Sequence, residues 1–315
     1  MKTLLNKWKL FQNEDSRFLL LTGLKFVGIF TFVALFVYYL VWIVASLNSV
    51  YFEARDLGKS IELREALTDS LLSVVVDKLP LGLVLLIMIF FAGVYFGKIL
   101  LRPFEVIGNY SAKSSEGESV EYNPDLFSDY KLLTRFSEFF FRYLEECKKE
   151  KRLKDATIPP TFTRIHGPTF ERVFFFHFLL LILIFTIITV FAVVYIIAEL
   201  RSQLFTILLN TTGKAASEQA SLFFLENQSF IFESIIWISV ILMIISYLTL
   251  AFHLYGKVSG AIFAFFSTMR SFMKGNRNAR VHLIGYAQIR PHGRAFNKYL
   301  DYIERLCENN ENKGN

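Results

Sequence analysis

The chain has 315 residues, of which 53% are hydrophobic, and its 34 Lys and Arg against 28 Asp and Glu give a formal charge of +6. Four apolar stretches are long enough to cross the ~30 Å hydrocarbon layer of a bilayer, which takes about 20 helical residues. The basic residues gather in the polar segments where membrane topology requires them, which argues against nucleic-acid binding. The composition therefore indicates a membrane protein.

In chain order, the apolar stretches form two hairpins with short loops, each followed by a polar segment. The predicted spans are Phe26–Leu47, Leu79–Leu101, Phe174–Ala198 and Phe230–Leu254. The expected parts are an N-terminal segment (1–25), a first transmembrane hairpin (26–101), a first cytoplasmic helical segment with a return linker (102–171), a second hairpin (172–256), a second cytoplasmic helical segment (257–307) and a disordered tail (308–315). We therefore predict an all-α polytopic membrane protein with four transmembrane helices.

The two halves of the chain match one another, which indicates an internal duplication. At an offset of 155, Gly58-Lys59 falls on Gly213-Lys214, and at 159 Gly97-Lys98 falls on Gly256-Lys257. At 160, Phe136 meets Phe296, Phe139 meets Tyr299 and Cys147 meets Cys307. Apolar matches arise easily by chance in so apolar a chain, but the Gly-Lys pairs fall at equivalent points of the two hairpins. Repeated units of this kind usually pack on one another.

The distribution of positive charge predicts the orientation. Segment 98–173 holds 13 Lys and Arg and segment 255–315 holds 10, whereas loops 48–78 and 199–229 hold four and two. By the positive-inside rule, both termini and the middle segment are cytoplasmic, and we expect a multi-pass protein of a bacterial inner membrane. Cys147 and Cys307 then lie in a reducing compartment, so we expect two small core residues, with no disulfide and no zinc site.

The predicted spans carry few signs of a transport pathway. No ionisable residue stands at mid-span, so transport or a channel is the least favoured function. Gly93 and Gly97 on the second span, and Gly256 and Gly260 at the end of the fourth, have the small-xxx-small spacing that permits close helix–helix approach. Incidental glycines are the alternative interpretation.

A helix continuing from the fourth span is predicted by apolar residues at spacings of 4, 3, 4 and 3, namely Val258, Ile262, Phe265, Met269 and Phe272. Gly275 ends this helix, an extended piece with Arg280-Val281 and Leu283 follows, and a second helix carries Phe296-Asn297 and Tyr299. On these residues the segment resembles a HAMP domain, the linker beneath the transmembrane helices of bacterial receptors and histidine kinases. The acidic start of that family's second helix is absent, and Gln288-Ile289-Arg290-Pro291 stands in its place.

The first copy has the same layout in a more diverged form. Pro103 follows the second span, a polar connector runs from Ser111 to Asp125, and Ser137 replaces the Asn of the second copy. HAMP domains resemble parallel four-helix bundles made by two chains, so the resemblance implies that this one chain forms such a bundle as a pseudo-dimer. The residues expected to pack the two helical pairs together are Phe136, Phe139, Tyr143, Phe296, Asn297, Tyr299 and Ile303.

No phosphate loop, zinc-protease motif, nucleophile elbow or dinucleotide fingerprint is found, so we expect no catalysis, no cofactor and no metal. The few residues after Cys307 leave no room for an output domain. We therefore expect a signal-relay or regulatory membrane protein whose HAMP-like helices couple the membrane helices to a separate cytoplasmic or membrane partner. The first alternative is a structural or assembly subunit of a larger membrane complex, and the second is a transporter or channel component. The expected surroundings are the lipid bilayer and either further copies of this chain or other subunits of a membrane complex.

Overall fold

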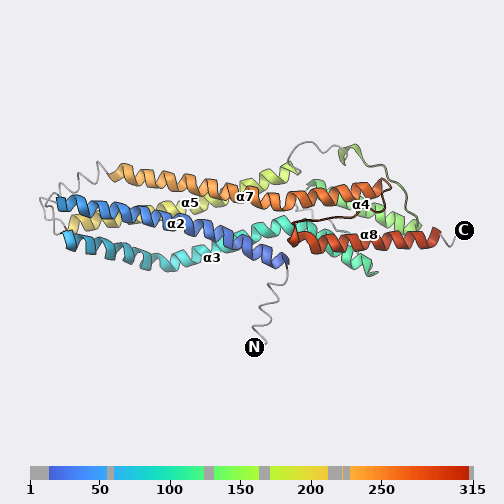
Figure 1. Ribbon diagram of the computed structural model, residues 1–315, viewed down its shortest axis with the longest axis horizontal. Coiled ribbons are helices and arrows are strands. Elements are labelled where there is room, and N and C mark those ends of the chain that lie inside the picture. The colour runs from blue at the N-terminus through green and yellow to red at the C-terminus, as the bar shows by residue number, and fades with distance from the viewer. Residues whose placement is uncertain are drawn as a thin grey trace, which may run out of the picture. The chain divides into compact units, whose positions relative to one another are not determined.

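A computed structural model describes residues 14–54, 60–123, 131–162, 171–211, 222 and 228–311. These residues are helical apart from connectors and two 3-10 turns, and no strand occurs among them. The helices are α2 (Glu14–Ala54), α3 (Ser60–Ser115), α4 (Lys131–Glu150), α5 (Arg172–Thr211), α7 (Ser229–Met273) and α8 (Arg290–Glu311), with 3-10 turns η1 (Pro160–Phe162) and η3 (Ala287–Ile289) (Figure 1). Most of the predicted N-terminal segment, the loop tips and part of the return linker lie outside the described residues.

Four helices, α2, α3, α5 and α7, are long and apolar enough to cross a membrane, which fits a multi-pass membrane protein. They contain 41, 56, 40 and 45 residues. At ~1.5 Å per residue the shortest reaches about 60 Å, twice the hydrocarbon thickness. The predicted all-α fold with four spans is therefore confirmed, but each helix extends well beyond its predicted span.

Two predicted ends differ from the observed helices. Pro103, expected at the start of a separate cytoplasmic helix, lies inside α3, which runs on to Ser115. At the C-terminus, α8 continues to Glu311, so the first residues of the predicted disordered tail are helical. At Pro103, burial in the long helix α3 decides the outcome, because tertiary packing overrides the local preference of proline.

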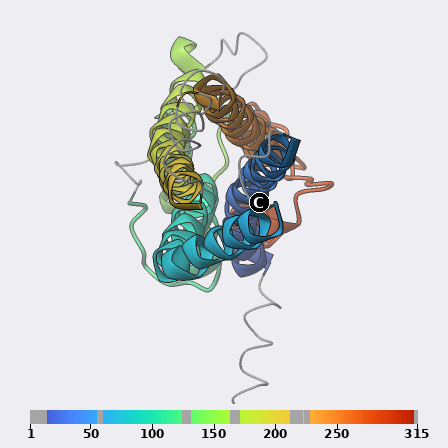
Figure 2. The same ribbon diagram turned by 90° about the vertical axis from the view of Figure 1, so that its left-hand side faces the viewer.

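The chain divides into two compact units, and the boundaries between them fall inside the four long helices. One unit, called here the membrane unit, contains residues 23–93 and 181–250. Figure 2 shows its four helices, α2, α3, α5 and α7, grouped as a bundle. Large apolar side chains cover its outside, and Phe32, Phe91, Phe191 and Trp237 are each at least 60% exposed. Such a surface suits lipid, because burial of apolar groups in a bilayer is favourable.

The interior of the membrane unit combines aromatic packing with a few polar contacts. The Phe26 ring lies 5.4 Å from those of Phe185 and Tyr247, and the Tyr247 hydroxyl donates to the Phe26 carbonyl at 3.2 Å. Towards the other end of α2, the buried amides of Asn48 and Gln228 pair reciprocally, with Asn48 Nδ2 donating to Gln228 Oε1 at 3.0 Å. Both amides are thereby satisfied in an apolar setting, which keeps their burial from being costly.

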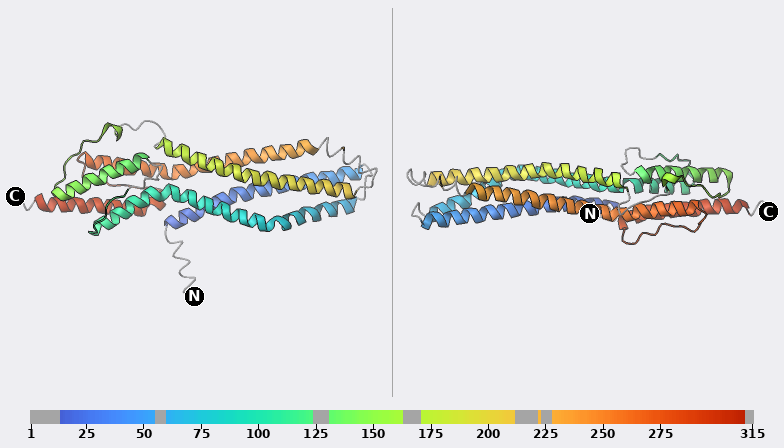
Figure 3. Two further views of the ribbon diagram at one scale, coloured as in Figure 1. Left: turned by 180° about the vertical axis from the view of Figure 1, so that it is seen from behind. Right: turned by 90° about the horizontal axis from the view of Figure 1, so that it is seen from above.

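The second unit, called here the coupling unit, contains residues 1–22, 94–180 and 251–315, of which the described part begins at Glu14. It holds α4 and α8 together with the C-terminal parts of α3 and α7, and both views of Figure 3 show these four segments alongside one another. The helices α4 and α8 are amphipathic: their buried positions recur every three or four residues, and the opposite face is charged. These two helices are therefore built to bury one face only.

Candidate functional site

The four helical segments of the coupling unit form a bundle in which every pair of helices shares an aromatic contact. Ring centroids lie 5.5 Å apart for Phe104 (α3) and Phe265 (α7), 4.4 Å for Phe136 (α4) and Phe266 (α7), 5.8 Å for Phe140 (α4) and Phe296 (α8), 5.8 Å for Tyr110 (α3) and Tyr299 (α8), 4.6 Å for Tyr110 and Phe141 (α4), and 5.4 Å for Phe265 and Phe296. Edge-on and tilted aromatic pairs at these separations stabilise beyond their burial. The two helical pairs of the chain therefore share one core.

The C-terminal part of α7 lies at the centre of this core. All five residues of its predicted apolar seam are fully buried: Val258, Ile262, Phe265, Met269 and Phe272. The helix ends at Met273, and Gly275 follows with φ of +96°, a conformation that glycine adopts without cost. The Gly275 N–H donates to the Phe272 carbonyl and the Asn276 N–H to the Ser271 carbonyl, so the turn satisfies carbonyls that the helix end leaves open.

The predicted packing residues of α4 divide between two environments. Phe136 is fully buried against Phe266 and against Phe162 of η1, whereas Phe139 is half-buried and stacks 6.2 Å from Phe162. The aromatic residues of α4 that contact aromatic residues of α8 are instead Phe140 and Phe141, both fully buried. On α8, Phe296, Tyr299 and Ile303 are buried in the core as expected. The buried side of α4 is instead indicated by apolar residues that recur every three or four positions, namely Leu133, Phe136, Phe140, Leu144 and Cys147.

Asn297 holds the connector between α7 and α8 against α8. Its side-chain oxygen accepts from the Val281 N–H at 2.8 Å, and its amide donates to the Val281 carbonyl at 2.9 Å. Nearby, Arg280 forms ion pairs of 2.6 Å with both Asp301 and Glu304 and is 17% exposed. At the matching position of the first copy, the Ser137 hydroxyl lies 2.7 Å from that of Tyr122 in the first connector. Each connector is thus bound to its second helix at an equivalent position.

Tyr143 joins the return segment after α4 to the end of α7. Its hydroxyl donates to the Lys154 carbonyl at 2.7 Å and accepts from Arg277 Nη1 at 3.0 Å. Arg277 also donates to the Phe272 carbonyl at 2.8 Å and pairs with Asp155 at 2.7 Å. Burial raises the pKa of Tyr143 to about 12, so the hydroxyl remains protonated at physiological pH. Tyr143, which was expected to be a packing residue, therefore links the return segment to the end of α7 by hydrogen bonds.

Glu171, the residue before α5, places its carboxylate at the N-terminus of α4. The Leu133 N–H donates to Glu171 Oε1 at 2.6 Å, and the Leu132 N–H also donates to this carboxylate. An anion suits this place, because the first N–H groups of a helix lack partners within it. Burial nevertheless outweighs these hydrogen bonds and raises the pKa of Glu171 to about 7. No sequence pattern pointed to this contact, since the two segments are 38 residues apart.

His292 in the first turn of α8 contacts two other helices of the coupling unit. Its Nε2 lies 3.0 Å from Oδ2 of Asp15 at the start of α2. On its other side the ring packs against Gly108 of α3, where an added Cβ would stand 2.6 Å from Nδ1. A glycine at position 108 therefore permits α8 to lie close to α3. Neither Asp15 nor Gly108 carried a signal in the sequence that singled it out.

The two predicted glycine pairs have different surroundings. Gly93 lies against Gly23 and Phe26 of α2, with an added Cβ only 2.9 Å from each, and Gly97 lies against Leu19 and Thr22 of α2. Gly260 instead packs against the Tyr286 ring of the connector, and Gly256 has no atom within 4 Å of an added Cβ. The first pair thus lies where α3 closely approaches α2, whereas the second pair does not bring two helices together.

In the part of the chain that the structure describes, potential metal ligands do not cluster at one place. Within that part, no group of three or more His, Cys, Asp and Glu side chains is placed to hold a metal ion. Cys147 and Cys307 are both buried and are not joined in a disulfide. No known family model, curated protein or solved structure matches this chain.

Proposed function

We propose that this protein is a non-enzymatic membrane relay, in which the bundle of the coupling unit passes a change in the membrane helices to a separate protein partner. One observation carries the proposal. Helix α7 is unbroken from Ser229 to Met273, and the apolar seam of its last turns is fully buried in the bundle core. A shift or rotation of α7 must therefore repack the aromatic side chains around it.

The resemblance of residues 257–307 to a HAMP domain supports the same function, because that module joins membrane helices to output in bacterial receptors. Two packings separated by a few kcal/mol are enough for a stimulus to change which one dominates. The surfaces of α4 and α8 that face away from the core are charged and present a polar face to a partner.

We further propose a bacterial inner membrane with both termini in the cytoplasm. The distribution of Lys and Arg supports this orientation. Cysteine introduced at Ser60, or at Ser217 outside the described residues, should react with an impermeant thiol reagent in spheroplasts. The native Cys147 should remain unlabelled, and its labelling would reverse the orientation.

A four-residue insertion after Gly260 tests the relay directly. Four steps of ~100° overshoot a full turn by about 40°, so the insertion turns the buried seam of α7 away from its partners. A seven-residue insertion is the matched control, since it returns the seam to within about 20° of its original direction. The partner is first identified by purification of the full chain in mild detergent and mass spectrometry.

The relay predicts that the four-residue variant keeps its partner but fixes the partner's output in one state, while the seven-residue variant still responds. A passive structural subunit predicts loss of the partner in the four-residue variant, with no output to fix. If the four-residue variant changes neither output nor association, the bundle serves neither role.

A further inference from the structure

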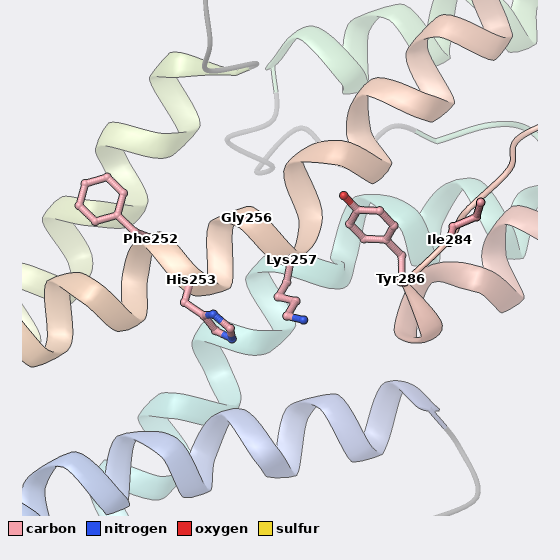
Figure 4. Close-up of a pocket in the computed structure, with 7 residues that line it drawn as sticks. Phe252, His253, Gly256, Lys257, Ile284 and Tyr286 are labelled. Atoms are coloured by element: carbon pink, nitrogen blue, oxygen red, sulfur yellow. The ribbon is translucent and has the colours of Figure 1, made fainter.

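The duplicated Gly-Lys pairs at the ends of the two hairpins have different surroundings in the coupling unit. Gly97, before Lys98, is covered by Leu19 and Thr22 of α2. Gly256, before Lys257, is open and lines a hollow of about 470 Å³ together with Phe252, His253, Lys257, Ile284, Gly285 and Tyr286 (Figure 4). The repeat therefore places the same two residues in a packed site in one copy and in an open site in the other.

The hollow lies where α7 leaves the apolar layer. Residues 234–256 contain no Asp, Glu, Lys or Arg, and at ~1.5 Å per residue they span about 35 Å, so Lys257 is the first fixed charge beyond the hydrocarbon. Phe252, one turn earlier, is 57% exposed on the apolar surface of the helix. Tyr286 also lines the hollow. Tyrosine is common at the depth of the lipid headgroups, which agrees with a hollow at that depth.

The connector that forms the other wall is fixed at this level by two contacts with α7. Gln288 Nε2 donates to the Lys257 carbonyl at 3.0 Å, and the Tyr286 ring fits against Gly260. Gly285 has φ of +83°, and beside this bend Ile284 is 91% exposed. Because Ile284 is exposed beside the end of a membrane span, its side chain can be buried against the acyl chains of the lipid.

The charged lining of the hollow is cationic. His253 and Lys257 are four residues apart on α7 and project from the same side of the helix (Figure 4). The Lys257 ammonium is a strong donor to phosphate oxygens, and the His253 ring donates through an N–H in either charge state. We propose that this hollow binds the headgroup of an anionic phospholipid, with the phosphate at His253 and Lys257 and the acyl chains beside Phe252 and Ile284.

The test uses the full chain in nanodiscs of phosphatidylcholine that contain either spin-labelled phosphatidylglycerol or spin-labelled phosphatidylcholine. Electron paramagnetic resonance then measures the immobilised lipid of each kind per chain. The wild type should prefer phosphatidylglycerol, and Lys257→Gln combined with His253→Gln should lower that preference about fivefold or more, as expected for lost charge at a membrane surface. Lys98→Gln removes the matching lysine charge at the packed copy of the site and should leave the preference unchanged.

A second pair of variants addresses the hollow without removing its donors. Because a Cβ added at Gly256 meets nothing within 4 Å, both Gly256→Glu and Gly256→Gln should fold, as checked by helicity and thermal unfolding. Gly256→Glu should abolish the preference by repelling the phosphate, and the neutral Gly256→Gln should retain most of it. Equal immobilisation of the two lipids by the wild type, or equal losses in Lys98→Gln and the double variant, would overturn the proposal. Displacement of the lipid by excess inorganic phosphate would also overturn it, since the site would then bind a free anion.

Discussion

The thiol of Cys307 lies 3.9 Å from the backbone carbonyl oxygen of Cys147, its counterpart 160 residues earlier in the chain. Both side chains are buried, one near the end of α4 and one near the end of α8. The duplicated positions thus meet within a single chain. If the two copies paired only between separate chains, Cys147 and Cys307 of one chain would not meet.

This arrangement predicts a cross-link within one chain. Oxidation of membranes with copper-phenanthroline should join Cys147 to Cys307 and give a faster-migrating band at monomer mass on a non-reducing gel, because the two helices are packed at these residues. Cys147→Ser is the control and should give no shift. A product at dimer mass in place of the fast monomer band would mean that α4 and α8 pair between chains.

A charge in the shared core should unfold the bundle of the coupling unit. Phe296 is fully buried and contacts Phe140, Phe141 and Phe265. Phe296→Asp loses this packing and buries a carboxylate, and it should lower the free energy of unfolding by at least about 3 kcal/mol. Limited proteolysis should then cut within α4 and α8 while membrane insertion persists. Lys298→Asp, an exposed position on the same helix, should keep the wild-type cleavage pattern.

The connector should depend on the single amide of Asn297. Asn297→Ala leaves both the N–H and the carbonyl of the buried Val281 without their present partner, which should cost about 2 kcal/mol. Hydrogen exchange at Val281 should become faster, and protease should cut between Arg280 and Tyr286. Asn276→Ala removes only an exposed bond to Ser271 and should change neither measurement. Unchanged exchange at Val281 in Asn297→Ala would show that other contacts hold the connector.

The four spans and the two amphipathic pairs were predictable, because apolar length and helical periodicity are local properties of the sequence. Asn297 was predictable only as a residue that packs the two helical pairs together, and its hydrogen bonds to the Val281 backbone are seen only in the structure. The extent of α3 was not predictable. Pro103 favours a break, and only the packing of Phe104 and Ile107 in the bundle core shows why the helix continues.

Of the predicted packing residues of α4, only Phe139 lies one position from the buried seam, because three consecutive phenylalanines, Phe139 to Phe141, fit two helical registers equally well. The contacts of Glu171 with α4 and of Asp15 with His292 join segments that are far apart in the sequence. Such contacts depend on how the helices are arranged, and a single sequence does not encode them in any local pattern.

Glu171 should make the stability of the coupling unit depend on pH. Its pKa is about 7 in the folded protein against an ordinary value of 4.5, because burial disfavours the ionised carboxylate. The folded state therefore holds a proton that the unfolded state releases, so the contribution is fully present below pH 4.5 and is lost as pH rises through 7. This loss amounts to at most about 3 kcal/mol.

Thermal unfolding in detergent between pH 5 and 8 measures this effect. Glu171→Gln should flatten the decline in stability, because the amide oxygen still accepts from the α4 backbone but does not ionise. Glu138→Gln, on the exposed face of α4, should retain the wild-type slope. A Glu171→Gln profile as steep as that of the wild type would assign the pH dependence to other groups.

Coupling between the two units is tested most directly by the rate of Cys147–Cys307 oxidation after a change in the membrane unit. The Asn48→Leu variant loses the buried amide pair and leaves the Gln228 side chain without its hydrogen-bond partner. This loss costs about 1–3 kcal/mol of stability, which is large enough to shift the balance between two packings of the helices. Ser46→Ala removes only an exposed hydrogen bond within α2 and is the control. The relay predicts a severalfold change in the oxidation rate for Asn48→Leu and none for Ser46→Ala. Identical rates in the wild type and both variants would contradict it.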